Sequence, residues 1–292
     1  MTTSKTEVFE EHRRTLFGIA YRMLGSVADA EDMVQEAWVR WDGSDADVQN
    51  PRAYLARTVT NLALNHLGSA AVRREEYVGP WLPEPLVTEP DASRDVEQAE
   101  SVSLAMLVVM ESLSPLERAV FVLKDVFGFP YAEIARVLDR TEASVRQVAH
   151  RARSNVQARR PRYAPPDEVR EVTERFLEAC LGGDMNQMME LLAPDVTAWT
   201  DGGGKVQAAL RPLHGADNVA RWLFGVLGRQ EAEVGARFAD VNGQPGIVML
   251  LDGRPDAVGV LDVADGRITG LRLVRNPDKL HGLSLRPPEG AP

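Results

Sequence analysis

Apolar residues recur at helical spacing in the first part of the chain. Residues 8–24 carry them on a three-to-four-residue period, as Phe9, Leu16, Ile19, Ala20 and Met23. That period places side chains on one face of a helix. Gly25 interrupts it, a second apolar face follows in residues 28–41, and Pro51 stands where it can open a third helix over residues 52–67. We therefore predict an all-helical first part.

A helix-turn-helix is predicted near the middle of the chain. Ile134, Ala135 and Leu138 give residues 131–138 a short apolar face, and Thr141 can cap the helix that follows. This second helix carries an apolar stripe made of Val145, Val148, Ala149, Ala152 and Val156. Its other face is polar and basic, which fits the major groove of duplex DNA. A solvated basic face on an ordinary helical hairpin is the alternative interpretation.

The last part of the chain has a different rhythm. Two helices are predicted over residues 168–181 and 185–192, and Gly182 and Gly183 end the first of them. Beyond Trp199 the pattern becomes strand-like in residues 236–241, 246–251, 257–263 and 268–274. Helices followed by an antiparallel meander predict an α+β domain.

Prolines mark the connections between these parts. They gather in residues 78–90 and again at Pro161, Pro165 and Pro166, which indicates extended linkers. The predicted division is a helical domain over residues 5–72, a proline-rich linker over 73–96, a helix-turn-helix domain over 97–162 and an α+β domain over 166–286.

Charge and cysteine usage narrow the function. The 292 residues carry a formal net charge of -10, yet arginine concentrates between Arg136 and Arg162. Such asymmetry is typical of a DNA-contacting module with protein-contacting neighbours. The single cysteine, Cys180, excludes a disulfide within the chain and favours a reducing cytoplasm. We expect no signal peptide, because the first 15 residues (MTTSKTEVFEEHRRT) lack its apolar region. We expect no membrane span, because no apolar run reaches about 18 residues.

Three segments resemble a known family. They are residues 27–40 (VADAEDMVQEAWVR), 50–65 (NPRAYLARTVTNLALN) and 113–156. In order and spacing they resemble domains two and four of an extracytoplasmic-function (ECF) RNA polymerase sigma factor. The last part resembles a cone-shaped SnoaL-like (NTF2-like) domain, and the whole chain resembles the ECF group in which such a domain is fused at the C-terminus. The implied fold is multidomain, with two all-α sigma domains, the second holding the helix-turn-helix, followed by an α+β domain.

The resemblance implies a role for each helical motif. The helix matching residues 29–41 would bind the clamp helices of the polymerase largest subunit through Asp32, Gln35, Glu36 and Trp38, with the flap region as a second polymerase contact. Simple core packing is the favoured interpretation of Met33, Val34, Ala37 and Trp41. Candidate contacts to the single-stranded −10 element are Asn50, Arg57, Asn61 and Asn65. For the −35 element they are Ser144, Arg146, Gln147 and His150 near base edges, and Arg151 and Arg153 at phosphates.

The resemblance also implies that the chain regulates itself. Motifs of the fused group are matched in the linker by residues 77–85 (YVGPWLPEP), and in the last part by residues 201–205 (DGGGK) and 276–280 (NPDKL). The implied regulatory residues are Trp81, Leu82, Pro83, Asp201, Gly202, Gly203, Gly204, Lys205, Asn276, Pro277, Asp278, Lys279 and Leu280. We expect Trp81 and its neighbours to dock on the extension or between the sigma domains. The sequence does not require a separate anti-sigma factor.

Two other classes of function stay open from the residues alone. One is a ligand-sensing, one-component transcription regulator, which would leave the motifs of residues 28–41 and 50–65 without a purpose. The other is an enzyme fused to a DNA-binding module, with Asp201, His214 and Trp199 as an acid/base set. An ordinary glycine-rich turn explains residues 201–205 equally well. The five histidines lack metal-ligand spacing, so we expect no metal. We also expect no cofactor, and the resemblance implies regulation instead of catalysis.

Overall fold

The computed structural model describes residues 4–44, 48–88, 102–159, 164–229, 232–281 and 283. The chain divides into two compact units. A helical unit combines Met1–Glu76 with Met106–Arg160, and an α+β unit combines Tyr77–Ala105 with Pro161–Pro292. Residues 73–76 of the predicted linker therefore belong with the helical unit, and residues 77–88 belong with the α+β unit. Residues 89–96 of that linker, and the predicted boundaries at 160–162 and 284–286, lie outside the described residues.

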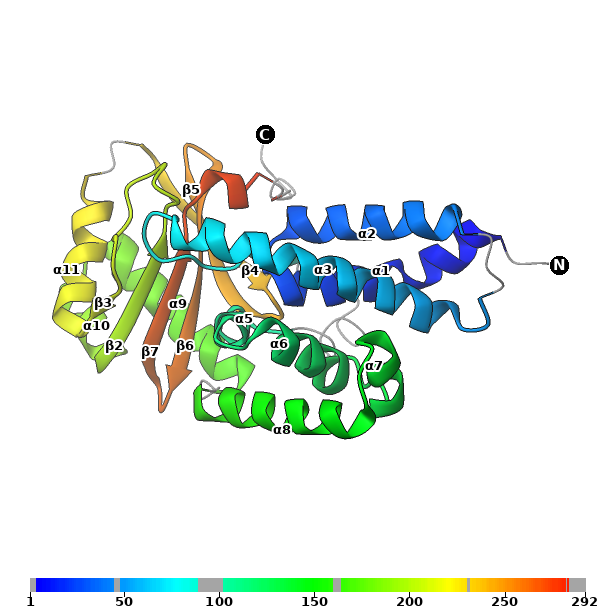
Figure 1. Ribbon diagram of the computed structural model, residues 1–292. Helices are drawn as coiled ribbons and strands as arrows, with labels where there is room; N and C mark the ends of the chain where they lie inside the picture. The colour runs from blue at the N-terminus through cyan, green and yellow to red at the C-terminus, as the bar shows by residue number, and fades with distance from the viewer. Residues whose placement is uncertain are drawn as a thin grey trace. The chain divides into compact units, whose positions relative to one another are not determined.

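The helical unit begins with the three predicted helices, α1 (Lys5–Leu24), α2 (Val27–Asp42) and α3 (Pro51–Glu75) (Figure 1). Ser4 caps α1 because its side chain accepts a hydrogen bond from the Glu7 N–H, and Gly25 ends the helix in the left-handed conformation. All five predicted apolar positions of α1 are buried. The third helix runs beyond the predicted end at residue 67, because Gly68 alone does not break it.

The predicted helix-turn-helix is confirmed. It follows α5 (Leu104–Glu111), α6 (Pro115–Phe121) and a π-helical turn, η2 (Val122–Val126), and it consists of α7 (Tyr131–Val137) and α8 (Glu142–Arg159). The Ser144 N–H donates to the Thr141 hydroxyl at 3.2 Å, which is the predicted cap. The whole apolar stripe of α8 is buried.

The two helical parts, predicted as separate domains, pack together within the helical unit. Helix α3 contacts α6 and α7. Arg118 of α6 donates from Nη1 to the Met23 carbonyl at 2.7 Å, and burial lowers the pKa of its guanidinium to about 10. The Arg22 and Arg52 guanidiniums lie over the rings of Phe127 and Phe129, at 5.1 and 4.5 Å from the ring centroids.

The α+β unit is one sheet with helices on a face (Figure 1). The helices are α9 (Pro166–Gly182), α10 (Met185–Leu191) and α11 (Ala216–Leu227). In sheet order the strands are β1 (Val87–Thr88), β4 (Val234–Val241), β5 (Gln244–Leu251), β6 (Arg254–Ala264), β7 (Arg267–Val274), β2 (Leu192–Asp201) and β3 (Leu213–His214). Phe176, Leu223, Ile247 and Leu261 contribute to the core between helices and sheet. The predicted α+β fold and the antiparallel meander of β4 to β7 are confirmed.

Several elements of this unit differ from the prediction, the short strand β3 among them. Strand β2 contains Trp199 and runs parallel to β7, with Asp201 opposite Val274. Its alternation is hidden in the sequence by Pro194 and by a shift of register between Leu192 and Thr197. Helix α11 and the linker strand β1, which pairs with β4, were not predicted. The parallel pairing brings the chain after β2 and the chain after β7 to the same edge of the sheet.

Across the part of the chain that the structure describes, no helix is both long and apolar enough to cross a membrane.

Candidate functional site

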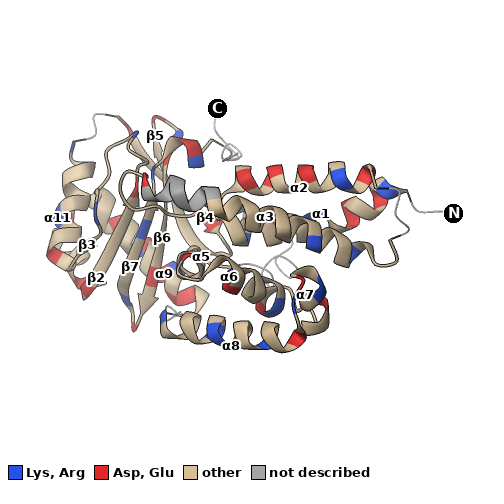
Figure 2. Cartoon of the chain, in the orientation of Figure 1, with Lys and Arg blue, Asp and Glu red and all other residues tan. Residues whose placement is uncertain are grey.

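The exposed face of α8 carries the predicted −35 contacts. Figure 2 shows basic residues spaced along this helix. Arg146, Gln147, His150, Arg151 and Arg153 are exposed, and Ser144 is half-buried. The register that buries the apolar stripe turns these side chains outward, so the predicted set occupies one accessible surface.

Each arginine of that face has a carboxylate partner in the helical unit. Arg146 pairs with Glu142 one turn earlier and also lies over the Tyr131 ring. Arg151 Nε lies 3.5 Å from Glu117, and Arg153 Nε lies 2.7 Å from Asp125. The hydrogen bond to Asp125 raises the pKa of Arg153, and a hydrogen bond from Ser114 lowers the pKa of Glu117. Exposed ion pairs of this kind are weak, so a DNA phosphate can replace the carboxylate.

The predicted polymerase contacts lie on α2. Asp32 and Gln35 are exposed, while Glu36 and Trp38 are half-buried. The Trp38 ring meets the Phe9 ring of α1 edge-on, with centroids 5.0 Å apart. Both rings line a groove between α1 and α2.

Burial on the rest of α2 follows the core-packing interpretation. Val34, Ala37 and Trp41 are buried and Met33 is half-buried. The acidic residues of α2, which Figure 2 shows along the helix, suit a basic partner.

The predicted −10 contacts lie on and before α3. Arg57, Asn61 and Asn65 recur every four residues, so they form one stripe on the helix. Arg57 and Asn65 are exposed and Asn61 is half-buried. Asn50 is exposed but also has a structural role that the sequence reading missed, because its side-chain oxygen accepts the Ala53 N–H at 3.0 Å and caps α3.

In the α+β unit, the predicted regulatory residues converge on the buried carboxylate of Asp201. Its Oδ1 accepts from the Tyr77 hydroxyl at 2.5 Å and from the Gly203 N–H at 3.2 Å. Its Oδ2 accepts from the Leu82 N–H and from Lys279 Nζ, both at 2.8 Å. One carboxylate thus joins the linker to both C-terminal motifs.

Lys279 and Asn276 complete this arrangement. Lys279 Nζ also donates to the Leu82 carbonyl at 2.5 Å and lies 4.3 Å from the centroid of the Trp81 ring. Asn276 Nδ2 donates to the Tyr77 hydroxyl at 2.7 Å. Burial, reinforced by the hydrogen bond to Asp201, raises the pKa of Tyr77 well above its usual value. We name this set the linker clamp, comprising Tyr77, Trp81, Leu82, Asp201, Asn276 and Lys279.

The glycine run after Asp201 lets the loop approach the clamp closely. Gly203 has a φ of +59°, and a Cβ there would lie 3.0 Å from the Tyr77 hydroxyl and overlap the Asn276 side chain. Lys205, at the end of the run, pairs with Asp278 at 2.5 Å. The run therefore serves close packing against the linker.

The remaining predicted regulatory residues lie nearby in the same unit. Pro83 and Leu280 are buried, and Pro277 opens the short 3-10 helix η3 (Pro277–Lys279). Tyr77 and Asn242 were missing from the predicted site. Tyr77 opens the linker motif, so its position was available from the sequence. Asn242 exchanges hydrogen bonds with the backbone of Leu86, at 3.1 Å and 2.8 Å, a pairing that no local pattern announces.

Asp201, His214 and Trp199 do not form an acid/base set. His214 Nδ1 lies 3.2 Å from the Thr197 hydroxyl, the Trp199 ring lies under the Arg272 guanidinium, and Asp201 is fully engaged in the linker clamp. Within the described ranges, no three His, Cys, Asp or Glu side chains are grouped so that they could hold a metal ion.

Comparison with known proteins covers nearly the whole chain. The family Sigma-70 region 2 matches residues 8–73, and Sigma-70, region 4 matches residues 103–156. The ECF RNA polymerase sigma factor SigJ of Mycobacterium tuberculosis is 42% identical, covering 95% of this chain and 94% of its own length. The probable ECF RNA polymerase sigma factor SigI of that species is 33% identical over 93% of both chains. The crystal structure of Mycobacterium tuberculosis SigJ is similar with a TM-score of 0.76 at 38% identity, covering 95% of this chain and 99% of that one.

Proposed function

The chain belongs to the ECF RNA polymerase sigma factors, and from that premise we propose that its linker clamp controls how the two sigma regions engage a promoter. As an alternative sigma factor, and not an enzyme, the protein binds core RNA polymerase and promoter DNA. The finer assignment divides these tasks among helices, with α2 contacting polymerase, α3 the −10 element and α8 the −35 element.

The observation that carries the proposal is the set of bonds at Asp201. They bind Leu82 and Tyr77 of the linker to one carboxylate, which lies 119 and 124 positions further along the chain, respectively. Because Asp201 is fully buried and Lys279 neutralises it, these bonds are not in competition with water. The clamp therefore fixes the shape of the linker segment that connects region 2 to region 4.

Promoter geometry gives this constraint a consequence. The −10 and −35 elements are separate sites along one duplex, and each intervening base pair of B-form DNA adds about 3.4 Å between them. Regions 2 and 4 pack together in the helical unit through Arg118 and Met23, and we expect them to part when they engage both elements. When the clamp holds the linker in one conformation, the linker limits how far and in which direction regions 2 and 4 can separate. A linker released from the clamp does not impose this limit.

Transcription from promoters of varied spacing tests the proposal. Core polymerase with the intact protein is assayed on promoters whose −10 to −35 spacer differs by one base pair at a time. We expect a sharp optimum for the wild type. We expect a broader optimum for the double variant Tyr77→Phe/Asn276→Ala, which removes clamp hydrogen bonds while keeping the buried Asp201–Lys279 pair.

The matched control is Asn218→Ala, which removes a hydrogen bond of the α+β unit outside the clamp. Circular dichroism checks that each variant folds. Identical spacer profiles for the double variant and the wild type would overturn the proposed control, while leaving the membership of the sigma factor family untouched.

A further inference from the structure

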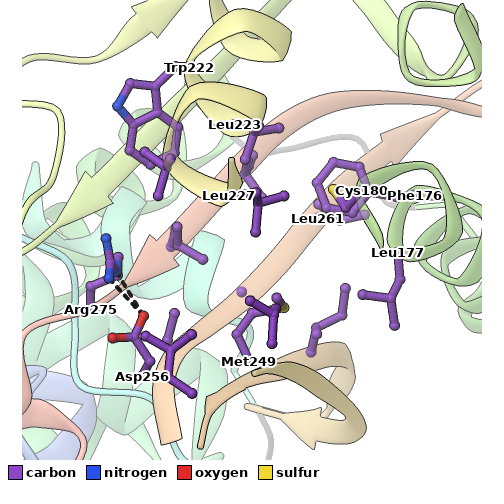
Figure 3. A pocket seen from close by; sticks show the side chains of 18 residues that line it. Phe176, Leu177, Cys180, Trp222, Leu223, Leu227, Met249, Asp256, Leu261 and Arg275 are labelled. Carbon is purple, nitrogen blue, oxygen red and sulfur yellow. Dashed lines mark hydrogen bonds and ion pairs between the residues drawn. The ribbon is translucent and has the colours of Figure 1, made fainter. Parts of the chain in front are cut away.

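Two arginines of this protein are held in different ways. Arg275 of the α+β unit donates to Asp256 Oδ2 from Nε at 3.1 Å and from Nη2 at 2.8 Å, and its Nη1 donates to the Gln207 carbonyl at 2.7 Å. Figure 3 shows this ion pair beside the mainly apolar side chains that line a cavity. The three bonds engage the edge of the guanidinium, where its N–H groups lie, so Arg275 serves the structure of its own unit.

Arg146 of α8 is held by its face instead. Its guanidinium carbon lies over the Tyr131 ring, 4.5 Å from the ring centroid, and its Nη2 pairs with Glu142. A ring that stacks on the face of a guanidinium leaves the N–H groups of the edge accessible. Within the described ranges this guanidinium donates to Glu142 alone, so the N–H groups on Nε and Nη1 remain for a base edge.

The Tyr131 side chain is fixed by its place in the fold. Pro130 precedes it as the N-cap of α7, with the φ of −61° that its ring imposes. Phe129 and Ile134, which lie on either side in the sequence, are fully buried. The Tyr131 ring also meets the Lys124 ammonium, 4.8 Å from its centroid, and that ammonium donates to the Phe129 carbonyl at 3.2 Å. Tyr131 is therefore a rigid support for an arginine that is otherwise exposed.

Such a support favours recognition of DNA by Arg146. A free arginine side chain occupies many rotamers, and ordering it against a base costs conformational entropy. The contact with Tyr131 removes part of that cost before DNA arrives, because the guanidinium already has a defined place. The ring uses the face and a base uses the edge, so both contacts can exist together. The pair with Glu142 uses an edge nitrogen and is the contact that a base can replace.

We propose that Tyr131 is the positioning residue for Arg146, because its ring holds the guanidinium so that the free edge reads one base pair of the promoter. The inference rests on the proposed assignment of α8 to the −35 element. Arginine binds guanine through O6 and N7 in the major groove, so we expect guanine in the base pair that Arg146 reads. Tyr131 acts on recognition through Arg146 and touches no base itself.

Selection of promoter DNA locates the base pair in question. Holoenzyme is assembled from core polymerase and the full-length protein, and the sequences that it selects from a pool of randomised duplexes define the cognate site. Affinities are then measured for duplexes that carry each of the possible base pairs at each −35 position. Arg146→Ala is expected to lower discrimination about five- to 150-fold at one position, which is the position that Arg146 reads.

Substitutions of Tyr131 test the inference at that position. Tyr131→Leu is expected to lower discrimination there about two- to fivefold, as for an exposed cation–π contact, and to leave the other positions unchanged. Tyr131→Phe keeps a ring under the guanidinium and should retain the wild-type discrimination. In an Arg146→Ala background, Tyr131→Leu should have no further effect. A residue that only supports the fold would instead weaken binding to all sequences, with or without Arg146.

The matched control is Lys124→Met, which removes a cation from the same ring and leaves the contact between Tyr131 and Arg146 in place. It should weaken binding to cognate and altered duplexes by the same factor. Circular dichroism checks the fold of each variant, and Tyr131→Met replaces the leucine variant if that one does not fold.

Full discrimination in a folded Tyr131→Leu or Tyr131→Met variant would overturn the inference. A loss of discrimination in Lys124→Met equal to that in the Tyr131 variants would do the same. If Arg146→Ala lost no discrimination at any position, base reading by α8 would fail together with the inference. A loss in Arg146→Ala without one in the Tyr131 variants would overturn the inference alone, so the two failures are distinguishable.

Discussion

The basic face of α8 and the linker clamp both pair cations with carboxylates, but in opposite surroundings. The side chains of Arg146, Arg151 and Arg153 are 59%, 61% and 47% exposed. In the clamp, the side chain of Asp201 is 0% exposed and that of Lys279 is 11% exposed. Water screens the first set and is excluded from the second.

Because of this difference, the arginines of α8 can exchange their carboxylate partners, whereas the ion pair of the linker clamp is expected to stay intact. An exposed pair contributes about 0–1 kcal/mol, so the arginines of α8 can leave their carboxylates for phosphates. Breaking a buried pair from one side leaves a charge without a partner, at a cost of about 3–5 kcal/mol. We therefore expect promoter contact to use the weak pairs and the proposed control of the linker to use the strong one.

The largest expected effect is that of Asp201→Ala. It leaves the Lys279 ammonium without its carboxylate and removes the acceptor of Tyr77 and Leu82, so we expect a loss of about 3–5 kcal/mol in the stability of the α+β unit. Urea unfolding measures it. Asp195→Ala, on an exposed position of the same strand, is the control and should change stability by less than about 0.5 kcal/mol. Equal effects of the two substitutions would remove the distinction drawn between the regions.

Arg146→Ala is expected to weaken binding to the cognate promoter by about 1–3 kcal/mol through lost base contact, with little change on unrelated DNA. Arg153→Ala, assigned to phosphate, should weaken binding to all sequences alike and reduce the salt dependence. Fluorescence anisotropy with both DNAs at several salt concentrations measures this. Uniform weakening by Arg146→Ala would argue against base readout by that residue.

Tyr77→Phe is expected to cost about 1 kcal/mol, because it removes the hydroxyl that donates to Asp201. The raised pKa of Tyr77 adds a pH dependence. The folded state retains the phenol proton more strongly than the unfolded chain, so the contribution of Tyr77 is fully present below about pH 10 and decreases as pH rises above it. Urea unfolding between pH 8 and pH 11 should therefore show the gap between wild type and variant narrowing at high pH. A gap that widened would contradict the assigned protonation.

The smallest expected effect is that of Asp125→Ala. It frees Arg153 from its carboxylate, so affinity for DNA should rise by up to about fivefold at low salt and by less at high salt. Glu133→Ala on α7 removes the same charge without that ion pair and serves as the control. Equal gains from both substitutions would attribute the effect to net charge alone.

In the helical unit, local sequence patterns were sufficient to predict the helices and the exposed face of α8. The apolar stripe of α8 has a period that only one helix register can bury, so the exposed set follows from it. The helix α11 carries Val219, Ala220 and Leu223 at helical spacing as well, but the strand-like segments around it masked this signal. Asn50 shows a second limit, because a cap and a DNA contact use the same residue type.

In the α+β unit, the features that could not be predicted from the sequence depend on pairing between strands that are far apart in the chain. The importance of Asp201 was available from its motif, but its acceptance of bonds from Tyr77 and Leu82 depends on β2 lying parallel to β7. The strand β1 forms only because β4 offers an edge to Val87 and Thr88. Neither the pairing of β2 with β7 nor that of β1 with β4 produces a periodic pattern of apolar residues in the sequence.

The sequence separation within the clamp also bears on how the protein is made. Lys279 lies 197 residues after the Leu82 carbonyl that it binds. At about 5–20 residues per second, a ribosome needs about 10–40 s to synthesise that interval. Regions 2 and 4 leave the ribosome during this time, before Asn276 and Lys279 exist. Each newly made molecule is therefore expected to pass through a period in which regions 2 and 4 are complete and the proposed restraint by the clamp is not.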